Sequence, residues 1–414
     1  MIDPERLLER FLRYVRVETT ADPSTSDYPS SPGQLDLGRI VAADLRDAGA
    51  ADAMVDPHGL VHALLPPTSG CEHAPTVALI AHLDTSPEAS GRDVRPRVIR
   101  DYDGGDITLE SGEVIEAAGV PGLSERRGGT VVVTDGRTLL GGDDKCGVAI
   151  IVETVAALAG SDDATHGPVR VLMTCDEEIG RGTDRIDVPA LNAAVAYTLD
   201  GGGRDVIDVE TFSADGAVVR FTGRNIHPSI GKGRMVNAVR AAADFVAALD
   251  RDATTPETTD ARDGFIHPYE IEGGVGEVTV RLILRSFDDA DLAMYADTIR
   301  DIARRVAAAI PGVNADVIVS RQYRNMAAGL RKLPAAVELP LRAAEILGRP
   351  FKTEIIRGGT DGSGLTEKGL PTPNLSSGQY NIHSTGEVAS LDDMTAAAEH
   401  LIETLRLWSD QTTS

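Results

Sequence analysis

Residues 77–84 read VALIAHLD, a short apolar run that ends in a histidine and an aspartate. A run of this length and composition is typical of a buried strand in a parallel sheet. Two further runs have the same form, because VRVLMTCDEE at 169–178 and AVAYTLD at 194–200 also end in carboxylates. Ligands bind beyond the carboxyl ends of the strands in open parallel sheets, so we expect these polar side chains to lie together. The sequence therefore predicts an α/β protein with a site at the strand ends.

The chain of 414 residues is longer than one ordinary hydrophobic core, which favours two domains. The pattern of apolar runs changes after about residue 212, where a block of strand, helix, strand, helix and strand begins. A block of this size can bury its own core. His383 follows the block, whereas the other candidate ligands precede it. We therefore expect residues 213–323 to be an inserted domain, and residues 1–212 and 324–414 to form one discontinuous catalytic domain.

Composition excludes several classes of function. The chain is 42% hydrophobic and 25% charged, as is typical of a globular protein, and its formal net charge of −24 argues against nucleic acid as a partner. Cys71, Cys146 and Cys175 form no CxxC pair, which suggests a reducing compartment. The N-terminal segment carries charges throughout, and no apolar run approaches membrane-spanning length. We expect a cytoplasmic protein that does not bind membranes.

The strand-end motifs hold five side chains of the kind that bind metal: His82, Asp143, Glu178, Asp200 and His383. Two zinc ions that share one bridging carboxylate need five protein ligands. One ion would take His82 and Asp200, the other Glu178 and His383, with Asp143 between them. Each motif alone is also common in ordinary loops, and one residue of the Asp143–Asp144 pair is also expected to act as a helix N-cap. The combined set of ligands carries the prediction, and such a site would also accept cobalt or manganese.

Two neighbours of these ligands have side chains suited to supporting roles. Asp84 lies two residues after His82, so both side chains share one face of an extended strand and the carboxylate can hold the imidazole. Glu177 precedes Glu178, and consecutive carboxylates at a strand end diverge. One of them can bind metal while the other takes a proton from water.

Seven segments together resemble the peptidase T family: HLDTSP (82–87), TDGRTLLGGDDKCG (134–147), TCDEEIGRG (174–182), YTLDGGG (197–203), NIHPSIGKGRMVNA (225–238), IRGGTDGSGL (356–365) and YNIHS (380–384). That family comprises tripeptide aminopeptidases with a cocatalytic dizinc site, and the resemblance runs nearly end to end. It implies a mixed, mostly parallel sheet flanked by helices, with an inserted α+β lid domain.

The resemblance also implies roles for individual residues. His82, Asp143, Glu178, Asp200 and His383 match the five zinc ligands of the family. Asp84 matches the acid that orients the ligand histidine, and Glu177 matches the general base.

Other matched positions lie in or near the predicted insert. His227 matches a histidine that stabilises the oxyanion, which in related enzymes can come from the partner subunit of a homodimer. Asn237, Arg285 and Arg357 match substrate-binding positions. For Arg285, an ion pair with Asp288 or Asp289 is an equally good interpretation.

These observations predict a zinc-dependent aminopeptidase that removes the N-terminal residue of short unblocked peptides, with tripeptides as the expected substrates. A metal-bridging water would attack, with Glu177 as general base. Two candidates for the acid that holds the substrate amine are Asp176 and Asp361. The alternatives are a related dizinc deacylase or carboxypeptidase that acts on N-acyl amino acids, and a non-catalytic peptide-binding homologue. Cys175, Ser229 and the HSTGE segment at 383–387 depart from the family pattern and bear on specificity.

Overall fold

The computed structural model describes residues 1–411, which form two compact units. Among the described residues, the first unit comprises Met1–Val209, Met326–Glu354 and residues 360–411. The second comprises Glu210–Asn325 and Ile355–Gly359. That 213–323 is a separately folding domain stays a prediction.

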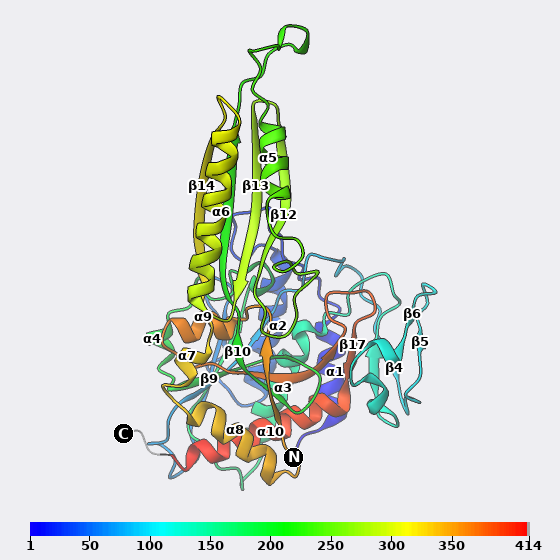
Figure 1. Cartoon of the computed structure of the whole chain (residues 1–414). Coiled ribbons are helices and arrows are strands. Elements are labelled where there is room, and N and C mark those ends of the chain that lie inside the picture. The colour runs from blue at the N-terminus through cyan, green and yellow to red at the C-terminus, as the bar shows by residue number, and fades with distance from the viewer. Residues whose placement is uncertain (412–414) are drawn as a thin grey trace. The chain divides into compact units, whose positions relative to one another are not determined.

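The first unit is built on one large mixed sheet (Figure 1). Its strand order is β1 (Met54–Val55), β2 (Val61–Leu65), β8 (Val169–Thr174), β3 (Val77–His82), β9 (Val195–Gly202), β16 (Asn374–Tyr380), β17 (Val388–Ser390), β7 (Val131–Val133) and β4 (Arg97–Ile99). Two further strands, β10 (Val206–Thr211) and β15 (Lys352–Ile356), pair with each other, and β10 also pairs with β16. The four central strands β8, β3, β9 and β16 are parallel, and the flanking pairs are antiparallel. The predicted mixed sheet is confirmed, and its parallel part is the centre.

The central strands form because their side chains are buried on both faces. Every residue of β3 is buried, as are all but one of β8. Strands of this kind must be covered by helices on both faces. The principal helices of this unit are α1 (Pro4–Tyr14), α2 (Pro32–Asp47), α3 (Gly142–Ala159), α8 (Ala335–Ile346) and α10 (Leu391–Ser409). Of these, α3 packs against β3 and β9 and also contacts α1 and α10.

Short elements complete this unit. They are the helices α4 (Val188–Leu191), α7 (Ala327–Leu330) and α9 (Asp361–Glu367), the ribbon of β5 (Ile107–Thr108) and β6 (Val114–Ile115), and the 3-10 turns Ala117–Gly119, Leu123–Arg126 and Glu177–Ile179. The ribbon belongs to a small apolar cluster that includes Leu123, Val131 and Tyr380. None of the described helices is both long enough and apolar enough to cross a membrane.

The second unit contains a four-stranded antiparallel sheet and two main helices. The strand order is β12 (Phe265–Gly274), β13 (Glu277–Ser286), β11 (Ser213–Thr222) and β14 (Asn314–Tyr323), and the helices are α5 (Ala238–Ala247) and α6 (Asp289–Ala309). A 3-10 turn spans Pro228–Ile230. The sequence pattern did not predict β12, because the last six residues of this strand are exposed and Pro268 interrupts it. It forms as an edge strand through its pairing with β13, which is a tertiary rather than a local cause.

Candidate metal centre

The central parallel strands carry three of the predicted ligands to one end of the sheet. His82 is the last residue of β3, Glu178 lies in the 3-10 turn directly after β8, and Asp200 lies near the end of β9. Asp143 stands at the start of α3 with non-helical φ and ψ, and His383 follows β16 with a left-handed φ of 59°. Both therefore occupy irregular backbone, which is common where side chains are aimed at a site.

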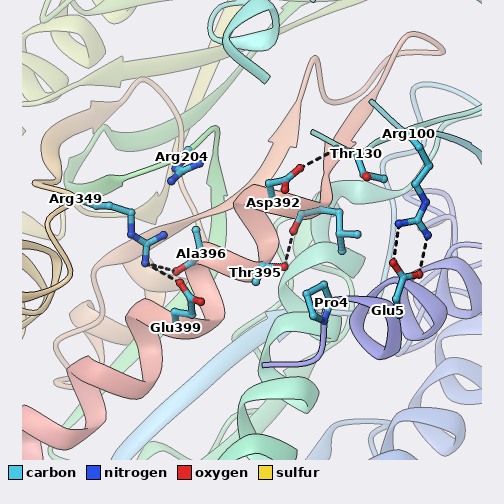
Figure 2. A pocket seen from close by; sticks show the side chains of 11 residues that line it. Pro4, Glu5, Arg100, Thr130, Arg204, Arg349, Asp392, Thr395, Ala396 and Glu399 are labelled. Carbon is cyan, nitrogen blue, oxygen red and sulfur yellow. Dashed lines mark hydrogen bonds and ion pairs between the residues drawn. The ribbon is translucent and has the colours of Figure 1, made fainter. Parts of the chain in front are cut away.

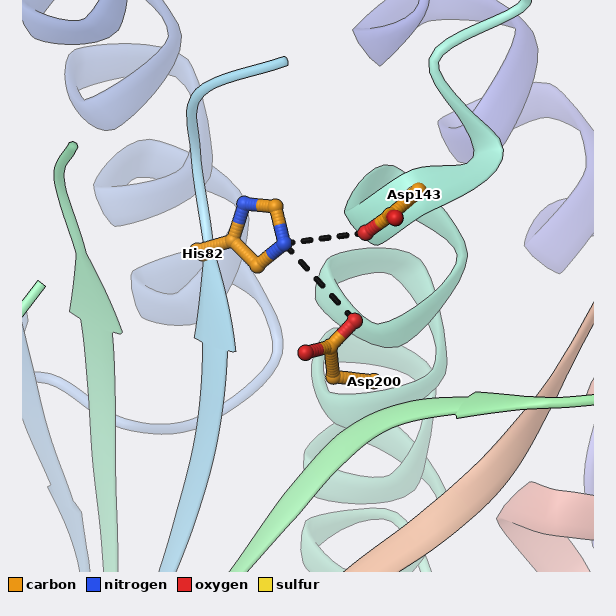
Figure 3. Close-up of side chains that lie close together, drawn as sticks. All are labelled: His82, Asp143 and Asp200. Atoms are coloured by element: carbon orange, nitrogen blue, oxygen red, sulfur yellow. Dashed lines mark hydrogen bonds and ion pairs between the residues drawn. The ribbon is translucent and has the colours of Figure 1, made fainter. Parts of the chain in front are cut away.

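The five side chains form two groups that share Asp143. In the first, His82 Nε2 lies 3.0 Å from Asp143 Oδ1 and 3.7 Å from Asp200 Oδ1 (Figure 3). In the second, His383 Nε2 lies 2.9 Å from Glu178 Oε2 and 3.3 Å from Asp143 Oδ2. Asp143 thus presents one oxygen to each group, which is the geometry of a bridging carboxylate. Within residues 1–411, these two groups are the only clusters of three or more His, Cys, Asp or Glu side chains close enough to hold a metal ion.

The donor set fits two cations. Ligand atoms about 2.0–2.1 Å from a tetrahedral zinc ion lie roughly 3.3 Å apart, and the distances in both groups scatter around that value. Glu178 Oε1 is buried and has no hydrogen-bond partner among the described residues. A buried carboxylate oxygen without a donor is costly unless a cation meets it. The chemistry of the residues therefore matches a pair of metal ions.

The tautomer of His82 also suits metal binding. His82 Nδ1 lies 3.2 Å from the backbone oxygen of Asp84 and 3.4 Å from its Oδ1. Nδ1 therefore carries the proton and donates it, which leaves the Nε2 lone pair directed at Asp143 and Asp200. Asp84 thus contacts the imidazole mainly through its backbone oxygen, and the role of its carboxylate in orienting His82 stays a prediction.

Asp84 has a second function that the spacing did not reveal. Its Oδ1 accepts a hydrogen bond of 3.1 Å from the backbone N–H of Glu177, and its Oδ2 accepts one of 3.0 Å from that of Glu178. The buried Asp84 carboxylate therefore holds the Glu177–Glu178 turn, and it lies 3.4 Å from the ring of the histidine ligand.

The electrostatic field of the centre attracts positive charge. Hydrogen bonds to Asp143 and Glu178 raise the pKa of His383 to about 11. Burial, together with the nearby Asp143 carboxylate, raises the pKa of Asp200 to about 7. Crowded carboxylates of this kind favour any cation that enters.

Glu177 is half-buried, and its carboxyl interacts electrostatically with His82 and Asp200 of the first group. Burial raises the pKa of its carboxyl well above the usual range, and the nearby His82 side chain opposes that effect. A carboxylate with a raised pKa has the affinity for a proton that a general base requires.

The two acids considered for the substrate amine differ in their surroundings. Asp176 accepts hydrogen bonds from the backbone and hydroxyl of Ser30 and from Gln34, and it forms an ion pair with Arg181. Both carboxylate oxygens of Asp176 are therefore already bonded to protein groups, and Asp176 is a poor candidate for binding the substrate amine. Asp361 accepts one hydrogen bond, of 2.6 Å, from the Thr174 hydroxyl, and burial raises its pKa to about 6. Asp361 remains the candidate of the two.

Four predicted residues belong to the second unit, where each has local contacts. His227 is exposed, and its Nδ1 lies 2.7 Å from Ser229 Oγ. Asn237 is the N-cap of α5 and accepts a hydrogen bond of 2.9 Å from the backbone of Val239. Its observed contact is therefore structural, and its substrate-binding role stays a prediction.

The two arginines also contact protein groups. Arg285 donates to the backbone oxygen of Leu284 at 2.9 Å and lies over the Tyr323 ring, so this contact replaces the ion pair considered with Asp288 or Asp289. Arg357 donates to the backbone oxygens of Thr259, Ala261 and Asp263 and lies over the rings of Phe212 and Phe265. Both arginines stay predictions as carboxylate clamps, and Arg357 would have to exchange these partners to serve as one.

A separate pocket on the first unit lies among charged side chains that pair with one another (Figure 2). Arg100 binds Glu5 through two hydrogen bonds, and Arg349 lies 3.4 Å from Glu399. Its charges are balanced within the pocket, and it contains none of the candidate ligands.

Sequence reasoning missed Glu387, a buried carboxylate that accepts three backbone N–H groups from the turn of Asp143. Its signal in the sequence is an acidic residue that ends the HSTGE segment and precedes the short apolar run VA, four residues after His383. The three cysteines are free, and Cys146 and Cys175 are buried.

Comparison with known proteins identifies relatives along the whole chain. Residues 209–311 match the model of a peptidase dimerisation domain. The chain is 38% identical over 410 residues to peptidase T of Geobacillus thermodenitrificans, covering 99% of each protein. It is 37% identical over 409 residues to peptidase T of Listeria monocytogenes, covering 98% of this chain and 99% of the relative.

Solved structures share the fold. Aminopeptidase PepT from Bacillus cereus superposes with a TM-score of 0.76 at 23% identity, covering 99% of this chain and 100% of the other. A dinuclear metal binding peptidase of the M20 family from Bacillus subtilis superposes with a TM-score of 0.64 at 14% identity, covering 98% of each. Because the chain is 37–38% identical to these peptidase T relatives over nearly its full length and shares the fold, it belongs to the peptidase T family of metal-binding aminopeptidases.

Proposed function

We propose that this aminopeptidase removes the N-terminal residue of short unblocked peptides, above all tripeptides, with two zinc ions in the candidate centre. The observation that carries the proposal is the shared position of Asp143, which presents one oxygen to the group of His82 and Asp200 and the other to that of Glu178 and His383. Five ligands in this arrangement are what a dinuclear hydrolytic site needs. Cobalt or manganese would be accepted by the same donors.

When bound, zinc supplies Lewis-acid polarisation of the scissile carbonyl and lowers the pKa of water. The protein supplies proton transfer. Glu177 takes the proton from the attacking water on its carboxylate and delivers it to the nitrogen of the leaving amine. Asp84 keeps Glu177 in place through the hydrogen bond to its backbone N–H. Asp361 is the proposed partner of the free substrate amine.

His227 is proposed to donate a hydrogen bond to the oxyanion that develops on the carbonyl. Ser229 supports the required tautomer, because both its hydroxyl and its backbone N–H, the latter at 3.3 Å, face Nδ1. With Nδ1 accepting, Nε2 carries the proton and can donate it. Donors of this type are worth about 3–4 kcal/mol of transition-state stabilisation.

Asn237, Arg285 and Arg357 are proposed to contact the substrate, with the arginines limiting its length by binding the far carboxylate. We further propose that the protein is a cytoplasmic homodimer, which the match of residues 209–311 to a dimerisation domain supports. His227 then acts either in its own subunit or in that of the partner.

The test is hydrolysis of Met-Gly-Gly by zinc-loaded protein, followed by chromatography of the released amino acids. N-acetyl-Met-Gly-Gly, the C-terminal amide and the Glu177→Ala variant run alongside. We expect free methionine from the unblocked peptide only, a reduced rate with the amide, and a rate lowered by at least about 10²-fold in the variant.

The other outcomes separate the alternatives. Cleavage of N-acetyl-Met-Gly-Gly instead would assign the protein to the deacylase or carboxypeptidase branch. Metal binding without cleavage of any of these peptides would favour a peptide-binding role or a different substrate. Equal rates with the tripeptide and its amide would contradict the proposed arginine clamp.

A further inference from the structure

Glu387 is a buried carboxylate whose oxygens both face the turn that carries Asp143. The residue is 1% exposed. Its Oε2 accepts hydrogen bonds from the backbone N–H of Leu140 at 2.9 Å and of Gly141 at 2.8 Å. Its Oε1 accepts one of 2.9 Å from the N–H of Asp143 itself. Three backbone donors satisfy this buried carboxylate, and the buried Lys145 ammonium interacts with it electrostatically.

The turn needs these acceptors because it has no regular structure. Gly141 has a left-handed φ of 77°, and Asp143 and Asp144 have non-helical φ and ψ although they precede the regular part of α3. The N–H groups at a helix start find no partner within the helix and must be satisfied from outside. Glu387 therefore supplies the hydrogen-bond acceptors that the backbone of this turn lacks. One of the N–H groups that it accepts from belongs to Asp143, whose carboxylate both ligand groups share.

Glu387 also belongs to the turn that carries His383. Its own N–H donates to the backbone oxygen of Ser384 at 3.3 Å, and Asn381 Nδ2 closes the same turn by donating to the oxygen of Gly386 at 2.9 Å. The Glu387 side chain thus ties the turn of His383 to the turn of Asp143. This connection joins the backbone segments of the two residues whose facing atoms lie 3.3 Å apart in the second group.

We propose that Glu387 is a positioning residue that sets the distance between Asp143 and His383, and so controls binding of the second metal ion. The inference rests on the proposed dinuclear function of the centre. Residues that orient metal ligands typically contribute 10–100-fold to metal affinity. Glu387 has that role here through the backbone, since it touches no atom of the metal site directly.

The test variant is Glu387→Gln in the full chain. A glutamine offers one acceptor oxygen and one NH₂ donor. If its oxygen faces the N–H groups of Leu140 and Gly141, the NH₂ group faces the Asp143 N–H, and that bond becomes a repulsive contact.

The matched control is Glu153→Gln. Glu153 is also fully buried, and it lies on α3, ten residues after Asp143. It accepts a hydrogen bond of 3.1 Å from the backbone of Asp3 and pairs with Arg6 and Arg10, and no ligand is among its partners.

The measurement is metal binding, by competition with a chromophoric chelator for zinc and by the visible spectrum of a cobalt titration. Thermal unfolding of the metal-free proteins runs in parallel. We expect both variants to unfold at lower temperature without metal. Only Glu387→Gln should bind the second equivalent of metal 10–100-fold more weakly. Wild-type affinity for both equivalents in Glu387→Gln, or equal weakening in Glu153→Gln, would overturn the proposal.

A second variant protects the test against misfolding of the first. Gly142→Ala keeps Glu387, but the added Cβ would lie 3.0 Å from Glu387 Oε1 and so displace it slightly. Gly142→Ala should also lower the affinity for the second equivalent of metal, by a smaller factor than Glu387→Gln. Unchanged affinity would contradict the proposal. The outcomes also separate the two levels of inference. Wild-type protein that binds two metal ions but cleaves no tripeptide refutes the proposed substrate and leaves the role of Glu387 standing, whereas wild-type protein that binds no metal refutes both.

Discussion

His400 should make the stability of this protein fall in mild acid. The side chain lies on α10 and is 1% exposed. Its Nε2 donates to the backbone oxygen of Pro340 at 2.8 Å, and its ring stacks on Phe351 at 4.1 Å between centroids. Burial lowers the pKa of His400 from 6.5 to about 4, and the positive charge of Arg349 acts in the same direction.

The sign of the effect follows from proton binding. Between pH 6.5 and 4 the unfolded chain takes up a proton at this position and the folded chain does not, so acid favours unfolding. The two pKa values of 6.5 and about 4 correspond to about 3 kcal/mol when the transition is complete. Between pH 7 and pH 5, His400 should lower the free energy of unfolding by about 2 kcal/mol.

The assay is urea unfolding of metal-free protein at pH 7, 6 and 5, comparing wild type with His400→Phe. The variant loses one hydrogen bond at every pH, but it cannot titrate at this position. The difference in unfolding free energy between the two proteins should therefore shift by about 2 kcal/mol in favour of the variant as the pH falls from 7 to 5. His58→Phe, at an exposed histidine, is the control and should leave the pH dependence as in wild type. A constant difference between wild type and His400→Phe across this range would refute the reasoning.

Three further predictions concern the metal centre and the core. Asp84→Asn should reduce activity about 10–100-fold, because an amide cannot accept from both backbone N–H groups of the Glu177–Glu178 turn, and steady-state kinetics of the correctly folded variant would show it. Removal of metal by EDTA should lower the midpoint of thermal unfolding, since an ion present at 100 times its dissociation constant stabilises the fold by about 2.7 kcal/mol; an unchanged midpoint would argue against a metal bound only by the folded state. Tyr197→Phe should cost about 1–3 kcal/mol in urea unfolding, because it leaves the buried Trp408 Nε1, now donating at 2.8 Å, without its acceptor. Tyr269→Phe, at an exposed ring, is the control for that change and should cost nothing measurable.

Much of the fold could be predicted because its central strands are buried on both faces. The run VALIAHLD forms β3 and its last polar residues reach the site, since a strand with no solvent-exposed face must be apolar throughout. The strand β12 could not be predicted in this way. Six of its ten residues are exposed, so its pairing with β13, and not its own pattern, makes it a strand.

The same distinction holds for the site. The five candidate ligands and the position of Asp84 two residues after His82 could be predicted from the sequence. Few kinds of side chain bind metal, and a strand places alternate residues on one face. The hydrogen bonds from the Glu177 and Glu178 backbone to Asp84 could not be predicted, because they join residues that lie 93 and 94 positions apart in the chain. The hydrogen bonds from Ser30 and Gln34 to Asp176 likewise join distant segments. They make Asp176 a poor candidate for the acid that binds the substrate amine.

By itself, the sequence determined the chemical inventory: two histidines and three carboxylates that can bind metal, a neighbouring glutamate to move a proton, and the family that uses them. Only the tertiary structure decided that Asp143 faces both ligand groups and that Glu387 holds its turn in place. The physical reason is that composition and local spacing specify which atoms can bind a cation or carry a proton. Distances of about 3 Å between segments more than 200 residues apart in the chain, such as that from Glu387 to Asp143, are set by packing of the folded chain.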